Sequence, residues 1–132
     1  TYKPEVILNR PNYDPFTQKL ELFENETEFE IEKGWNVVNL TAEEKEAFLQ
    51  EWRSGAQVSM RQARLALIQE NLLSSVNSAI QNLQEPDKTI VETEWEYAAV
   101  VDRSSPWMAL MATQLGLTDE QMDDLFKLAS TL

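Results

Sequence analysis

The spacing of apolar residues changes along the chain, and this change limits the fold more than any other feature. Residues 24–32 alternate, with Glu at every even position and Asn, Thr, Phe or Ile at the odd positions. From Met60 onward, apolar residues instead recur at steps of three and four. The first period is that of a half-buried β-strand and the second that of an amphipathic helix. The sequence therefore predicts an α+β fold, with a small N-terminal antiparallel β-sheet followed by a C-terminal all-helical bundle.

The sheet is predicted within the first 40 residues. The alternating segment at 24–32 is interpreted as its central strand, and Lys33-Gly34 as the turn that follows. The other predicted parts are a short strand at 5–8, an apolar stretch at 20–23, a turn at 24–26 and a strand at 35–40.

Five glutamates of the alternating segment are predicted to share one face: Glu24, Glu26, Glu28, Glu30 and Glu32. A metal or a basic ligand is one interpretation of this row. The carboxylates would, however, point outward about 6–7 Å apart, and the sharp glycine turn of a calcium loop is absent. We favour a solvated face that also blocks edge-to-edge pairing of sheets.

A helix is predicted after the sheet, over residues 42–53. Thr41 and Glu44 have the spacing of a capping box, in which each side chain bonds the other residue's backbone N–H. The small residues of Ser54-Gly55-Ala56 follow as a linker. We therefore predict a β-rich domain at 1–55 that ends in a helix, and a helical bundle domain at 56–132.

Four further helices are predicted in the second domain. The first covers 60–83, begins with a capping signal at Ser59 and Gln62, and ends before Pro86. The others are a helix at 88–101, a helix from Pro106 that ends at Gly116 in a Schellman motif, and a last helix with a capping box at Thr118 and Gln121.

Composition excludes several kinds of chemistry. The 132 residues contain no Cys and no His and only three Gly. Disulfides, thiolate nucleophiles, imidazole zinc sites and glycine-rich phosphate loops are therefore excluded. We expect no enzymatic activity, no cofactor and no metal. No signal peptide or apolar run of membrane-spanning length is visible, so no membrane partner is expected. The net charge of −12 argues against nucleic acid and favours basic partners.

Two arginines, Arg61 and Arg64, lie one helical turn apart in an acidic sequence. They are suited to clamping a carboxylate of a partner. They are equally suited to internal pairing across packed helices, and we favour that interpretation. The acids available for such pairing are Glu92, Glu94 and Glu96.

Aromatic residues near the acids do not define an active site. Successive helical residues point about 100° apart, so Glu94 and Glu96 do not converge beside Trp95 and Tyr97. Trp107 has the spacing of a core residue, although tryptophan is also frequent in contact surfaces. The acids at 119–124 lie at the start of a predicted helix, where their negative charges interact favourably with the positive end of the helix dipole.

Several segments together resemble a small helical module of tailed-bacteriophage tail-fibre gene clusters. The segments are 60–67, 94–98, 102–106 and 115–118, with apolar residues at Leu72, Leu73, Val76, Ala79, Ile80 and Leu83 and with Pro86. The N-terminal segments 13–19, 34–38 and 40–44 are also similar to short proteins encoded beside the fibre. The resemblance covers most of the chain and implies either a fibre-assembly chaperone or a tail component. It implies no catalytic residue.

The leading hypothesis is a non-enzymatic tail-fibre assembly chaperone that acts in the host cytoplasm. The partner would be a fibre or other tail protein, and self-association into a homo-oligomer is compatible with the same surfaces. Candidate partner-binding residues are Arg61, Arg64, Trp95, Tyr97, Trp107 and Trp35. The first alternative is a structural component of the virion tail or baseplate. The second is an acidic inhibitor or DNA mimic.

Overall fold

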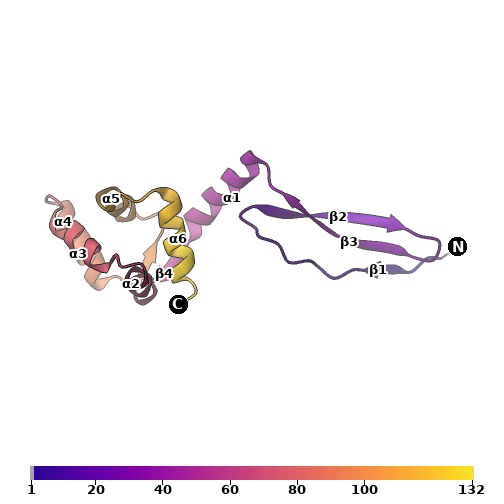
Figure 1. The fold of residues 1–132 in the computed structure, drawn as a ribbon, viewed down its shortest axis with the longest axis horizontal. Helices are drawn as coiled ribbons and strands as arrows, with labels where there is room; N and C mark the ends of the chain where they lie inside the picture. The colour runs from indigo at the N-terminus through magenta and orange to yellow at the C-terminus, as the bar shows by residue number, and fades with distance from the viewer. Residues whose placement is uncertain (1) are drawn as a thin grey trace. The chain divides into compact units, whose positions relative to one another are not determined.

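The structure is a computed structural model that describes residues 2–132 and divides into two compact units. The first unit ends at Gln50 and the second begins at Glu51. This division lies inside helix α1 (Ala42–Gly55), whereas the sequence places the boundary after Gly55. The chain has the predicted α+β fold, in which an N-terminal three-stranded sheet is followed along the chain by helices (Figure 1).

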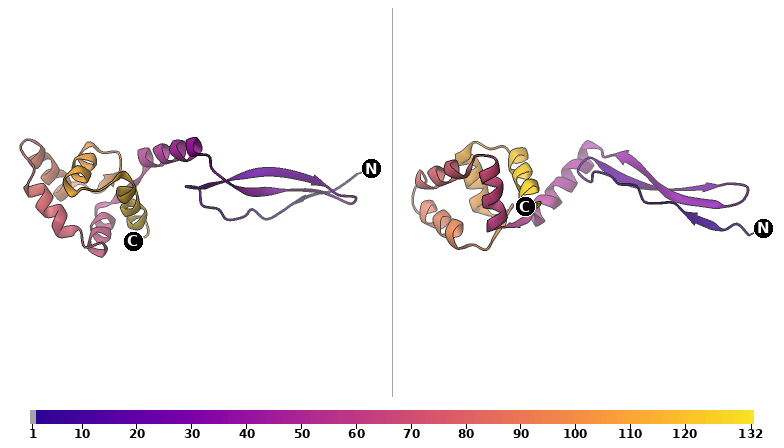
Figure 2. Two further views of the ribbon diagram at one scale, coloured as in Figure 1. Left: turned by 45° about the horizontal axis from the view of Figure 1, so that its top comes forward. Right: turned by 60° about the horizontal axis from the view of Figure 1, so that its bottom comes forward.

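The sheet of the first unit contains strands β1 (Glu5–Ile7), β2 (Gln18–Glu26) and β3 (Ile31–Asn39). Strand β3 lies in the middle, with the order β1-β3-β2, as the views of Figure 2 also show. β2 and β3 pair antiparallel along their whole length. β1 pairs parallel to β3, so the predicted antiparallel arrangement applies only to the β2–β3 hairpin.

The predicted central strand over residues 24–32 is wrong, because the chain reverses inside it. The Thr27 backbone N–H donates to the Glu30 carbonyl at 2.8 Å, and the Thr27 hydroxyl accepts from the Glu30 N–H at 3.1 Å. These bonds close the turn between β2 and β3. The alternation of glutamates continues through the turn and therefore hides it in the sequence.

Gly34 lies within β3 and not in a turn as predicted. It pairs with Phe23 of β2, and a Cβ atom at Gly34 would lie 2.8 Å from the Phe23 ring. A ring that covers a glycine in a neighbouring strand fills the space left by the missing side chain. Glycine is therefore used here for close packing.

Helix α1 begins as predicted. The Thr41 hydroxyl accepts from the Glu44 N–H at 3.2 Å, and the Glu44 carboxylate accepts from the Thr41 N–H at 3.1 Å. In the first unit, the Phe48 ring packs edge-on against Phe16 with ring centroids 5.1 Å apart. This contact joins the first turns of α1 to the loop before β2.

The second unit consists of six helical segments and a two-stranded ladder among the residues described. After the end of α1, its elements are β4 (Gln57–Ser59), α2 (Met60–Gln69), α3 (Leu73–Gln81), α4 (Asp87–Tyr97), β5 (Val100–Asp102), α5 (Pro106–Leu115) and α6 (Asp119–Ala129). The capping boxes at Ser59 and Thr118 are confirmed.

The prediction of an all-helical bundle is wrong at two short strands. β4 and β5 pair antiparallel, with Val58 opposite Val101. Both valines are buried in the same apolar cluster. The predicted helix at 88–101 therefore ends at Tyr97, and Val101 reaches the core from a strand.

The predicted single helix over 60–83 is also wrong, because a Schellman motif separates α2 from α3. Asn71 adopts a left-handed conformation with φ of 56°. The N–H of Leu72 donates to the Leu67 carbonyl at 2.8 Å, and the N–H of Asn71 donates to the Ile68 carbonyl at 3.1 Å. Asparagine tolerates this conformation better than most residues do.

The core of the second unit has two clusters of buried apolar side chains. One contains Val58, Val101, Met122 and Phe126, and the other contains Val76, Ile80, Val91 and Met111, each with further members. Trp95 and Trp107 pack against both clusters. The two tryptophans therefore join the clusters into one core.

Candidate functional site

The apolar side chains that the structure describes in the first unit are half-buried or exposed, and none is fully buried. Among residues 2–50, the structure buries no apolar side chain, and Gly34 is the only buried residue. A sheet usually buries one apolar face against another layer of structure. This unit therefore has an apolar surface without a covering layer of its own.

One face of the β2–β3 hairpin carries a row of apolar side chains. The register places Leu22 opposite Trp35 and Leu20 opposite Val37, and directly opposed residues of antiparallel strands share a face. We call this the Leu22 face. The Leu22 side chain is 77% exposed. The Arg10 guanidinium lies 6.0 Å from the centre of the Trp35 ring, so it partly covers one end of the row.

The predicted row of five glutamates on one face is not formed. Glu24 and Glu26 lie on the Leu22 face of β2, whereas Glu32 of β3 pairs with Asn25 on the opposite face. The other two glutamates lie in the turn that joins the strands. The turn also presents Phe29, whose side chain is 78% exposed.

Four ion pairs lie among the described residues of the first unit, and the longest joins Lys19 to Glu21 of the same strand at 4.0 Å. Lys3 bonds Glu26 at 2.7 Å, Lys33 bonds Glu5 at 2.8 Å, and Lys19 bonds Glu44 of α1. The hydrogen bond from Lys19 lowers the pKa of Glu44, and the same bond raises the pKa of Lys19. The hydrogen bond to Glu5 raises the pKa of Lys33. The charges of all three lysines are therefore directed toward acids of the same unit.

Strand β2 is an edge strand. It pairs with β3 on one side and with no strand described by the structure on the other. Its register with β3 runs without interruption from Gln18 to Glu26, so it has no bulge. An edge strand of this kind presents unpaired backbone N–H and C=O groups, which can pair with another chain.

The two arginines of α2 have different surroundings. Arg64 donates from Nη2 to the Trp95 carbonyl at 2.6 Å, and its guanidinium lies 4.2 Å from the centre of the Trp95 ring. Arg61 is exposed and forms no hydrogen bond or ion pair with the residues described. The favoured pairing with Glu92, Glu94 or Glu96 is therefore not formed. Arg64 instead contacts the backbone and ring of Trp95 on α4.

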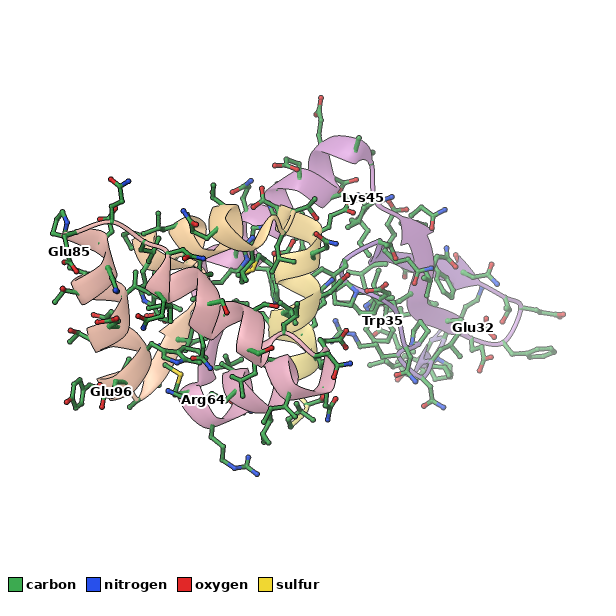
Figure 3. All side chains as sticks on the ribbon, turned by 60° about the vertical axis from the view of Figure 1, so that its left-hand side comes forward. Glu32, Trp35, Lys45, Arg64, Glu85 and Glu96 are labelled. Carbon is green, nitrogen blue, oxygen red and sulfur yellow. The ribbon has the colours of Figure 1, made fainter. Side chains whose placement is uncertain are left out.

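The remaining predicted partner-binding residues do not form one surface. Trp95 and Trp107 are half-buried core residues of the second unit, while the Tyr97 side chain is 76% exposed. Trp35 belongs to the first unit, where Figure 3 labels it, and the strand register places it on the Leu22 face. Of the six predicted residues, Arg61 and Tyr97 are exposed and the other four are half-buried, and the binding role of all six stays a prediction.

The assignment of the acids at 119–124 to the helix dipole is wrong for Asp123, which forms buried ion pairs in the second unit instead. Asp123 is 3% exposed and accepts from Nε and Nη2 of Arg53, the latter at 2.7 Å, and from Nε of Arg103 at 3.1 Å. Arg103 also contacts Asp119. The network joins the end of α1 to α6 and to the residue after β5. Its oxygens are fully used by guanidinium groups, so the network is structural.

A cavity of about 60 Å³ lies in the core of the second unit. Its walls are apolar side chains, among them Trp95, Trp107 and Phe126. Apolar cavities of this kind stay dry and offer no polar group to orient a substrate. The cavity is therefore a packing feature.

Two kinds of site were not found in the part of the chain that the structure describes. No group of three or more acidic residues is arranged to hold a metal ion. No helix within residues 2–132 combines the length and apolar composition needed to cross a membrane.

Comparisons with known proteins identify no relative of this chain. No protein-family model matches the chain, and no curated protein or solved structure matches it either. The candidate site is therefore defined by geometry alone, as the Leu22 face and the open edge of β2.

Proposed function

We propose that this protein is a non-enzymatic tail-fibre assembly chaperone of a tailed bacteriophage, which binds a fibre protein during folding or assembly. The observation that carries the proposal is the uncovered apolar surface of the first unit. An apolar sheet face and an unpaired edge are the two features that bind extended protein segments. The resemblance of segments 60–67, 94–98 and 102–106 to modules of tail-fibre clusters directs the proposal to a fibre.

The chemistry of the chain supports binding over catalysis. It has no His and no Cys. The carboxylate of Asp123, which is buried, is held by two arginines and has no access to a substrate. The net charge of −12 keeps such a protein soluble while it shields a fibre segment.

The test is co-expression with the fibre protein encoded beside it in the phage genome. The soluble complex is analysed by size-exclusion chromatography and mass measurement, and purified virions are analysed by mass spectrometry. We expect a soluble complex with the fibre and no copy of this protein in virions. Retention in virions at a constant ratio to the fibre would indicate a structural tail component instead. Absence of any complex would refute both roles.

A further inference from the structure

We propose that the outer edge of β2 binds its partner by strand addition, and that the added segment carries Lys or Arg around a central apolar residue. This inference rests on the proposed function, because it names the site at which the fibre segment binds and the side chains that the segment carries.

The edge of β2 lacks most of the features that prevent strand addition. Edge strands are usually protected by bulges, prolines, short length or charged side chains, and of these β2 has only the charges, which are those of its glutamates and of Lys19. β2 has nine residues, no bulge and no proline. Its one lysine, Lys19, lies near the start of the strand, bonds Glu44 and lies 4.0 Å from Glu21. From Leu20 to Glu26, the outer side of the β2 backbone pairs with no strand that the structure describes.

The charges along the hairpin decide which strand fits. Residues 20–32 contain six Glu and no Lys or Arg. Lys19 lies 4.0 Å from Glu21 and Lys33 lies opposite Glu24, but these two lysines bond Glu44 and Glu5, so the acids of the hairpin remain in excess. Neighbouring strands lie about 4.8 Å apart, so their side chains on one face are in contact. Like charges on opposed positions destabilise a pair of strands, and opposite charges stabilise it. A second copy of β2 is therefore disfavoured, and a basic strand is favoured.

The positions of the charges define the pattern of the partner. An apolar residue beside Leu22 would extend the row that Leu22 forms with Trp35. Basic residues would then lie beside Glu21, on the opposite face, and beside Glu24, on the same face. From its N-terminus, an antiparallel partner strand would therefore have a basic residue beside Glu24, any residue next, an apolar residue beside Leu22 and a basic residue beside Glu21. This order follows from the two-residue period of a strand.

The test uses a nine-residue peptide that contains Lys-Thr-Val-Lys, with a matched peptide that has Glu in place of both Lys. Each is titrated into the full-length protein, and the backbone amide signals are followed by NMR. We expect the signals of residues 18–26 to shift with the Lys peptide and not with the Glu peptide. No shift at millimolar Lys peptide, or equal binding of the Glu peptide, would overturn the proposal.

A charge-reversal variant locates the contact. Glu21→Lys combined with Glu24→Lys is expected to weaken binding of the Lys peptide at least tenfold. The control combines Glu70→Lys with Glu96→Lys, which makes the same change in net charge at two exposed positions of the second unit. We expect the control to stay within twofold of the wild type. Equal weakening by both variants would mean that net charge alone attracts the peptide and would overturn the proposal.

Two further outcomes separate this proposal from the proposed function. If the wild-type protein and the Glu21/Glu24 variant form the fibre complex equally well, strand addition at β2 is wrong while the chaperone role stands. If the Lys peptide binds β2 but the protein forms no fibre complex, the edge is a binding site and the chaperone role is wrong. Signals of β2 that shift with protein concentration alone would identify a second copy as the occupant and overturn the proposal.

Discussion

Replacement of Asp123 by Ala is expected to lower the free energy of unfolding of the second unit by about 3 kcal/mol. The carboxylate accepts from three N–H groups, two of Arg53 and one of Arg103. Hydrogen bonds to charged groups contribute about 1.5–3 kcal/mol each, so the upper limit is roughly 5–9 kcal/mol. The side chains of Arg53 and Arg103 are 17% and 10% exposed, and water reaches part of each guanidinium after the substitution. The expected loss is therefore near the lower end of the range for a broken buried ion pair.

Urea unfolding of the full-length chain, followed by far-ultraviolet circular dichroism, measures this loss, because most of the helical residues lie in the second unit. Asp124→Ala is the matched control, since Asp124 is the next residue of α6 and is exposed. The control is expected to stay within about 0.5 kcal/mol of the wild type. A loss below about 1 kcal/mol for Asp123→Ala would show that the two arginines are not held by this carboxylate and would refute the reasoning.

Three further predictions concern a helix end, an arginine contact and an ion pair. Gly116→Ala is expected to cost about 1 kcal/mol in urea unfolding, because Gly116 has φ of 67° and alanine is strained there; no loss would contradict this. Arg64→Lys is expected to lower the free energy of unfolding by about 1–2 kcal/mol, since lysine cannot both bond the Trp95 carbonyl and stack on its ring. Thermal unfolding measures this loss, with Arg61→Lys as the control. The hydrogen bond from Lys19 lowers the pKa of Glu44, so its stabilisation is present above the ordinary value of 4.5 and is lost as pH falls through the lowered pKa. The pKa of Lys19 is raised, so the same bond is lost at alkaline pH only as pH rises through a value above 10.5. The difference in urea midpoint between the wild type and Glu44→Gln should be constant from about pH 6 to 9 and shrink in acid; a difference that grows in acid would contradict the assignment.

Helix ends could be predicted because their signals lie within a few residues. The capping boxes that begin at Thr41, Ser59 and Thr118 each join residues three apart, and all three are present. The same locality applies to the Schellman motif at Gly116, whose left-handed residue is a glycine. The identical motif at Asn71 was missed, because the apolar period continued across it and asparagine is a weaker signal than glycine.

The candidate site could be predicted only in part. The sequence identified Trp35 as a partner-binding candidate and the hairpin segment as acidic. It did not locate the turn at 27–30, because alternation of glutamates continues on both sides of it. The open edge of β2 follows from strand order, which depends on the parallel pairing of β1 with β3. No local pattern in the sequence encodes that order.

The α+β class, the three capping boxes, the Schellman motif at Gly116 and the exclusion of histidine or thiol chemistry follow from residue types and short spacings alone. Strand pairing, the division of the glutamates between two faces and the arginine pair around Asp123 were decided by tertiary structure. Arg53 and Asp123 are 70 residues apart, and β4 and β5 have three residues each, too few for a period to appear. Such contacts form only when distant segments pack together, because their stability comes from burial and pairing between segments and not from any preference within one segment.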